Sequence, residues 1–202
     1  MTEKPLLLVD VDGVLCPFHF KELPDGCAYL DVEINDTTCQ GRYLETITVA
    51  FDPRQVARLA RLAEAFELHW ATIWERFANT KLAPLSGLPV LPVMPIDEGL
   101  PSPVPVHLSE VLNGNTTSKL GSVAAYVGER PCAWVDDRIR YDAQEWAEKR
   151  SVAGIPTLLV RTEPWDGLTD AQVEQLLTFA AELERAAAIR EANLAAVAAQ
   201  LL

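Results

Sequence analysis

The chain is poor in cysteine and in basic side chains, and each shortage argues against a class of protein. It has four cysteines in 202 residues, and their spacing matches no zinc-binding pattern such as paired CxxC motifs. Lysine and arginine number 17 against 29 acidic residues, which gives a net charge of −12. So acidic a protein repels polyanions, which argues against tight non-specific binding of nucleic acid.

Long apolar runs and secretion signals are also missing. No stretch approaches the length needed to cross a bilayer, and the first residues lack a hydrophobic leader with a cleavage site. We therefore expect a cytoplasmic protein without membrane contact, in which the cysteines are reduced thiols. The hydrophobic content of 49% and the length of 202 residues suit one globular domain with a sizeable core.

The most informative stretch joins a short apolar run to two aspartates. Leu6–Val9 is apolar at every position, which predicts a strand buried on both faces of a parallel sheet. Asp10 and Asp12 follow, and both leave the strand end on the same side because strand side chains alternate. Gly13 then allows a sharp turn. Two carboxylates at one strand end repel each other unless a cation or a shared proton compensates, which indicates metal-assisted chemistry.

Helix and strand patterns alternate along the rest of the chain and predict an α/β fold, a Rossmann-like parallel sheet with helices on both faces. Proline crowds residues 84–105, where we expect a surface connection around one short strand. The expected elements are a helix at 52–66, a strand at 67–72, a helix from about Trp74, a strand at 90–94, a helix at 118–127, a strand at 132–136, a helix at 139–150 and a strand at 155–160.

Two segments depart from this alternation. Tyr29–Ile34 and Tyr43–Val49 alternate polar and apolar residues around Asn35-Asp36, which predicts a β-hairpin with its turn at that pair. Residues 169–202 form one long helical pattern that opens with a capping box. We therefore expect an α/β domain over residues 1–168, with an insertion at about 14–50. The C-terminal helix over 169–202 packs on that domain or pairs with a second copy of the chain.

Three further positions fall at strand ends or helix starts. Thr72 ends the second strand, Lys119 lies just inside the helix at 118–127, and Asp136-Asp137 ends the strand at 132–136. Ligands bind at the carboxyl ends of the strands in open α/β sheets, so we expect these residues to converge on Asp10. Each has an ordinary structural explanation by itself, such as helix capping by Asp136-Asp137. Their joint occurrence in this order carries the argument.

An acid pair, a hydroxyl, a lysine and a second acid pair, in this order, resemble the haloacid dehalogenase (HAD) superfamily of phosphotransferases over about residues 6–160. The resemblance implies that Asp10 is a nucleophile forming an aspartyl-phosphate. Asp12 would protonate the leaving oxygen and then activate water, which favours a phosphatase over a dehalogenase. Thr72 and Lys119 would bind the oxygens of the transferring phosphoryl group.

The same resemblance implies a Mg²⁺ site and a flap. Asp10, Asp136 and the backbone carbonyl of Asp12 would hold the ion, and Asp137 would support it through water or through Lys119. The hairpin occupies the position of a flap that overhangs the active site in this superfamily.

We therefore expect a magnesium-dependent phosphatase acting on a phosphomonoester. Two alternatives stay open. One is a non-catalytic binding or regulatory protein on a HAD scaffold. The other is processing of nucleic-acid ends, because the Val-Asp-Asp-Arg motif and the near absence of a cap resemble polynucleotide 3′-phosphatase and RNA-repair domains. The expected partner is a phosphorylated small molecule or a nucleic-acid end, with a homodimer through the C-terminal helix as a further prediction.

Overall fold

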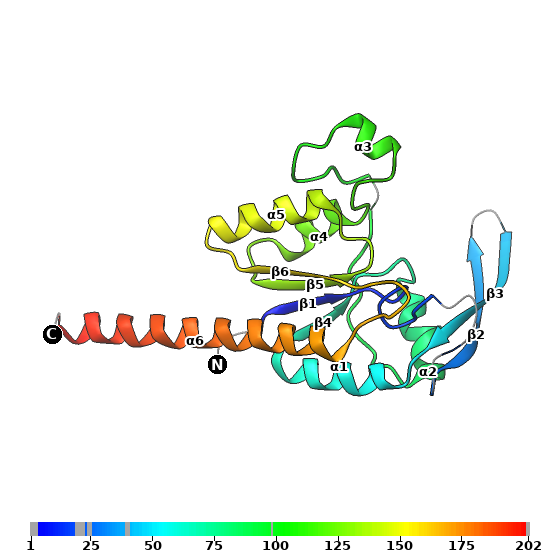
Figure 1. Ribbon diagram of the computed structural model, residues 1–202, viewed down its shortest axis with the longest axis horizontal. Coiled ribbons are helices and arrows are strands. Elements are labelled where there is room, and N and C mark those ends of the chain that lie inside the picture. Colours follow the sequence, from blue (N-terminus) through cyan, green and yellow to red (C-terminus); the bar gives the residue numbers. More distant parts are fainter. Residues whose placement is uncertain (1–3, 19–22, 24–25, 39–40, 98, 201–202) are drawn as a thin grey trace.

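The centre of the protein is a parallel sheet of four strands. The computed structural model describes residues 4–18, 23, 26–38, 41–97 and 99–200 (Figure 1). β1 pairs with β4 on one side and with β5 on the other, so its four residues are all buried. The expected α/β fold with a parallel sheet is confirmed. In the order β4-β1-β5-β6, the strands are Glu67–Trp70, Leu6–Val9, Cys132–Asp136 and Thr157–Arg161.

Helices cover both faces of this sheet, as expected (Figure 1). Side chains of β1 alternate between the two faces: Leu7 and Val9 join a core cluster on the side of α1 and α6, whereas Leu6 and Leu8 join one on the side of α4 and α5. The strand therefore holds the two layers together, because each face buries half of its side chains. The four helices are α1 (Arg54–Ala65), α4 (Leu120–Val127), α5 (Tyr141–Val152) and α6 (Asp170–Gln200).

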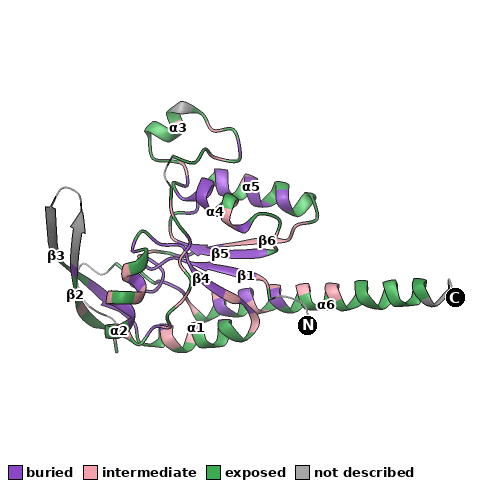
Figure 2. Cartoon of the chain, turned by 180° about the vertical axis from the view of Figure 1, so that it is seen from behind, coloured by how far each residue is buried: buried purple, intermediate pink, exposed green. Residues whose placement is uncertain are grey.

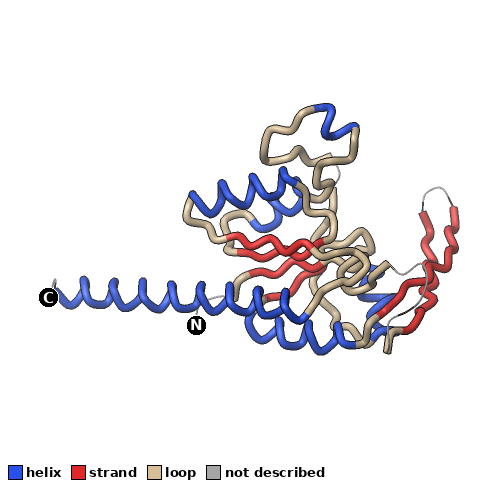
Figure 3. Tube along the Cα trace, viewed as in Figure 1, coloured by secondary structure: helices blue, strands red, loops and turns tan. Residues whose placement is uncertain are grey.

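The segment after β4 differs from the expectation in two places. The helix expected from Trp74 begins after a turn and contains η1 (Ala78–Leu82) and α2 (Ala83–Ser86). The strand expected at 90–94 is wrong: Val93 makes only an isolated bridge to Trp70. The prolines of this stretch have no N–H to donate to a longer ladder. The chain continues as loop around the short helix α3 (Leu108–Leu112), as Figure 3 shows.

An antiparallel hairpin stands beside the carboxyl ends of the strands (Figure 1). It consists of β2 (Ala28–Thr38) and β3 (Gly41–Phe51). The turn expected at Asn35-Asp36 is wrong, because these two residues pair with Leu44 and Tyr43 inside the ladder. Backbone pairing continues through the polar pair, so a turn-favouring dipeptide does not end the strand here. The connection lies at residues 39–40, outside the described residues.

The C-terminal helix α6 is packed at its start and projects beyond the sheet afterwards (Figures 1 and 2). Its capping box is confirmed: the Thr169 N–H donates to Gln172 Oε1 at 3.0 Å. Val173, Leu176 and Ala180 are buried, whereas residues 188–198 are exposed. Pairing of the projecting part with a second copy stays a prediction. Within the described part of the chain, no helix combines the length and low polarity needed to cross a bilayer.

Candidate active site

Lys119 joins the carboxyl ends of three strands. Its Nζ lies 2.6 Å from Asp10 Oδ2 and 2.6 Å from Asp136 Oδ2. It also donates a hydrogen bond of 3.0 Å to the carbonyl oxygen of Ala71. Asp10 follows β1, Asp136 ends β5, and Ala71 follows β4. Because parallel strands end at the same edge of a sheet, segments far apart in sequence meet at one ammonium group.

A buried carboxylate fixes the loop that carries Lys119. Asp142, in the first turn of α5, accepts the Thr117 hydroxyl at 2.7 Å and the Thr117 N–H at 3.0 and 3.1 Å. The Thr117 hydroxyl oxygen accepts the N–H of Arg140 at 2.9 Å. Since α5 follows β5, these bonds tie the Lys119 loop to the segment after Asp136. This contact could not be predicted from the sequence, because an acid at a helix start usually indicates only capping.

Three carboxylates lie near Lys119, and its one positive charge balances only one of them. Asp10, Asp136 and Asp137 each place one oxygen within 4.8 Å of the others; we call these three and Lys119 the site cluster. Asp136 is fully buried, and its Oδ1 accepts the Arg138 N–H at 2.8 Å. Its Oδ2 lies 2.6 Å from Lys119 Nζ, in a buried ion pair.

The donor set fits a hard divalent cation. Buried carboxylates are costly unless cations compensate them, and Asp10 and Asp136 share the single ammonium of Lys119. Three carboxylates against one ammonium leave room for two positive charges, and oxygen ligands are those that Mg²⁺ prefers. The three carboxylates of the site cluster are therefore able to hold such an ion.

Burial and mutual repulsion shift the titration of this cluster. Burial, and then the charge of Asp136, raise the pKa of Asp10 from 3.8 to about 7, although Lys119 opposes the shift. Burial also raises the pKa of Asp12 and of Asp137. For Lys119, burial lowers the pKa, but the charges of Asp10 and Asp136 outweigh it and the net shift is upward. The lysine is therefore protonated at neutral pH.

Trp74 holds the carboxylate of Asp12. Its Oδ2 accepts the indole N–H of Trp74 at 3.0 Å, and it does not belong to the group of clustered oxygens. Gly13 makes this turn with φ +70°, and a Cβ there would lie 2.7 Å from Cγ of Asp137. The Thr162 hydroxyl donates to the Gly13 carbonyl oxygen at 2.7 Å. The turn after β1 therefore needs glycine.

Thr72 lies beside this edge and is fully buried. It follows Ala71, whose N–H donates to the carbonyl oxygen of Val9 at 2.9 Å, one residue before Asp10. Its hydroxyl oxygen accepts the N–H of Trp74 at 3.4 Å, a long bond. The predicted residues thus gather at one edge of the sheet. The contacts of Trp74 with Asp12 and of Thr162 with Gly13 were not predicted, because they follow no periodic sequence pattern.

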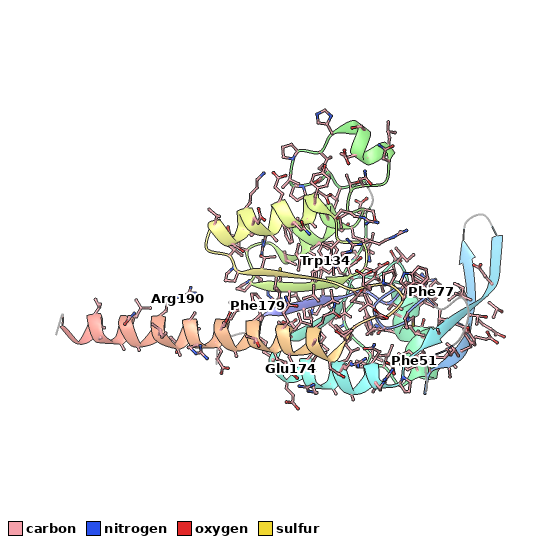
Figure 4. All side chains as sticks on the ribbon, viewed as in Figure 1. Phe51, Phe77, Trp134, Glu174, Phe179 and Arg190 are labelled. Atoms are coloured by element: carbon pink, nitrogen blue, oxygen red, sulfur yellow. The ribbon has the colours of Figure 1, made fainter. Side chains whose placement is uncertain are left out.

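A cavity of about 490 Å³ adjoins Asp12, between the strand ends and the hairpin. Figure 4 labels Phe77, which lines it, between these two parts of the molecule. Asp12 and Glu45 are the acidic residues of the wall, and no lysine, arginine or histidine occurs among the described lining residues. Most of the wall is apolar or aromatic, including Phe18, Tyr29, Ile34, Ile47, Val49 and Trp74.

Among the cysteines that the structure describes, none contributes a reactive group to this site. Cys16 lines the cavity but is buried, and burial, with Asp12 and Asp10 next, raises the pKa of its thiol. A protonated thiol is a poor nucleophile. Cys16, Cys27 and Cys132 are free thiols, as expected; Cys39 lies outside the described residues.

Comparison with known proteins adds no relative to this picture. No family model, no curated protein and no solved structure matches the chain. The chemistry of the site cluster, of Asp12 and of the cavity beside it is therefore the evidence for a function.

Proposed function

We propose that this protein is a HAD-type phosphatase that hydrolyses a phosphomonoester through an aspartyl-phosphate on Asp10. In this proposal the parallel sheet is Rossmann-like and the β2–β3 hairpin is the flap. One observation carries it: the Lys119 ammonium lies between Asp10 and Asp136, while Trp74 holds a further carboxylate, Asp12, through its own hydrogen bond. A purely structural ion pair has no need of that additional, separately oriented acid.

The chemistry divides between the two acids after β1. A carboxylate oxygen of Asp10 attacks phosphorus, and the bond from phosphorus to the leaving oxygen breaks while Asp12 gives its proton to that oxygen. Asp12 then takes a proton from water, whose oxygen attacks the aspartyl-phosphate and releases phosphate and free Asp10. Burial raises the pKa of Asp12, which suits it to carry the proton before the first step.

Other residues stabilise the charge that the phosphoryl group brings. Lys119 supplies a protonated ammonium at Asp10, and Thr72 supplies a hydroxyl on the neighbouring strand end. Mg²⁺ held by Asp10, Asp136 and Asp137, with the Asp12 carbonyl that the resemblance implies, would neutralise phosphoryl oxygens. A binding protein without turnover is the alternative, but the complete set of acids, hydroxyl and lysine favours the enzyme.

The test of this proposal is the substitution Asp10→Asn, which keeps the shape of the side chain and removes the nucleophile. Phosphate release in the presence of Mg²⁺, measured over a panel of phosphomonoesters, should fall by about 10³-fold or more. Circular dichroism and the melting temperature report whether the fold survives. The matched control is Asp170→Asn, at a side chain that is 74% exposed at the start of α6, and it should retain the wild-type rate.

A second readout looks at the intermediate itself. Acid quenching during turnover should leave one phosphoryl group on the wild-type protein, at Asp10, and none on the variant. Turnover by Asp10→Asn within tenfold of wild type would contradict the assignment.

A further inference from the structure

We propose that the substrate is the phosphomonoester of an apolar or aromatic alcohol that carries no negative charge of its own. Its organic part occupies the cavity between the hairpin and Trp74. This inference depends on the proposed phosphatase activity and adds the class of substrate. It favours a small molecule over the end of a polynucleotide.

The position of Asp12 decides where the organic part lies. Asp12 would protonate the leaving oxygen, and it also lines the cavity. The group attached to that oxygen therefore extends past Asp12 into the cavity. Trp74 contacts both the proposed acid and the cavity. Its indole N–H donates to Asp12 Oδ2, and its side chain lines the cavity.

The surface of the cavity is chemically suited to an apolar group. Its volume of about 490 Å³ falls within the range of roughly 300–1,000 Å³ that is typical of small-molecule sites. Three of its lining residues are large apolar or aromatic side chains that remain exposed: Phe18 at 40%, Tyr29 at 53% and Ile73 at 69%. A patch of exposed apolar side chains around a cavity marks a binding site more often than a surface without function.

Charge argues against a polynucleotide in this place. Each flanking phosphate of a nucleic-acid end is normally neutralised by lysine or arginine. The described lining residues offer Asp12 and Glu45 instead. The Arg76 guanidinium lies 4.6 Å from the centre of the Phe77 ring, but Arg76 is not among the lining residues. The described part of the wall therefore presents no cation to a negatively charged organic part.

The experiment compares substrates whose leaving alcohols are similar in acidity and differ in apolar surface. We expect kcat/KM for benzyl phosphate to exceed that for ethyl phosphate by about tenfold or more, since the ring buries additional apolar area. A short oligonucleotide with a 3′-phosphate should be a poorer substrate than benzyl phosphate. Tyr29→Ala and Ile73→Ala, at exposed positions where the fold tolerates truncation, should each reduce the preference for benzyl about threefold or more. Val152→Ala, at an apolar side chain of α5 that is 90% exposed, is the matched control and should leave the preference unchanged.

A binding measurement separates this inference from the phosphatase proposal. Isothermal titration of Asp10→Asn protein with 2-naphthol, a phosphate-free aromatic alcohol, should show binding that Tyr29→Ala weakens. Equal kcat/KM for benzyl and ethyl phosphate, or a preference for the oligonucleotide, overturns the inference while the phosphatase stands. Absence of phosphate release from every substrate overturns the proposed function. In that case, naphthol binding that Tyr29→Ala weakens still supports an apolar ligand in the cavity. Absence of naphthol binding overturns the apolar ligand as well.

Discussion

Two clusters of acids and cations lie in different parts of the fold, and charge balance separates them. The site cluster sets three carboxylates against one lysine. The second, which we call the anchor cluster, consists of Asp52, Arg54, Arg58 and Asp170. Asp52 Oδ1 accepts the N–H of Arg54 at 2.9 Å and its Nε at 2.8 Å, and Arg58 bridges Asp52 and Asp170 at 3.3 and 2.8 Å. Two acids therefore meet two cations there.

The titration of the two clusters follows this balance. Burial raises the pKa of Asp52, but the hydrogen bonds and charges of Arg54 and Arg58 outweigh it, so the net shift is downward. For Asp10 burial and repulsion win, and the pKa rises to about 7. The anchor cluster connects α1 to α6, and the charges of its own side chains balance one another. The site cluster stores repulsion that a bound cation would relieve, which is what distinguishes a candidate site from a structural contact.

The largest contrast should come from removing one cation from each cluster. Lys119→Met leaves buried carboxylates without their ammonium, a loss of about 3–5 kcal/mol in the free energy of unfolding. Arg58→Met should cost about 1–2 kcal/mol, because its partners are hydrogen-bonded or partly exposed. Urea denaturation of metal-free protein measures both. Lys119→Met should also lower phosphate release about 100-fold or more, whereas Arg58→Met should not. Equal losses of stability would remove the distinction between the clusters.

Magnesium should stabilise the protein through the site cluster alone. At a concentration 100 times the dissociation constant, binding contributes about 2.7 kcal/mol, or about 5–10 °C in melting temperature for a chain of this size. Asp136→Asn should abolish that shift, and without metal it should melt no lower than wild type, since repulsion is relieved. The matched control Asp52→Asn should melt lower yet keep the full shift. A magnesium shift that survives Asp136→Asn would place the ion elsewhere.

The parts of this picture that could be predicted from sequence are those that follow from strand ends. Uniformly apolar runs predicted the strands at 6–9 and 132–136 with their boundaries. Since parallel strands share a carboxyl edge, the convergence of Asp10, Lys119 and Asp136 followed from topology. The strand at 155–160 was placed about two residues early, because Ile155 and Pro156 are apolar but precede the ladder.

The remaining parts depend on contacts that no local pattern encodes. The bond from Trp74 to Asp12 spans 62 positions, and that from Thr117 to Asp142 spans 25. Both residue types have ordinary roles in core packing and helix capping, so their local sequence gives no signal. The cavity is equally hidden, because it forms only when the hairpin stands beside the strand ends.

A smaller effect should appear in the pH dependence of metal-free stability. Between the unfolded pKa of 3.8 and the folded value of about 7, folded Asp10 binds a proton that the unfolded chain has released. Stability therefore falls as the pH rises through this window. Melting temperatures in a chelator should decrease from pH 5 to pH 8, and Asp10→Asn should flatten the change. Asp52 shifts the other way, so its contribution is lost only on acidification below about pH 4. An unchanged slope in Asp10→Asn would assign the effect to another group.

The smallest effect should come from an ion pair that matches the site in distance but not in burial. Arg61 Nη2 lies 2.5 Å from Glu174 Oε1, between α1 and α6, with side chains 47% and 62% exposed. Water screens such a pair and ordering its long side chains offsets the attraction. Glu174→Gln should therefore change the melting temperature by less than about 2 °C, and the difference should vanish at about 0.5 M salt. Phosphate release should stay at the wild-type rate. A loss of stability as large as that of Lys119→Met would show that distance, rather than burial and charge balance, sets the strength of these contacts.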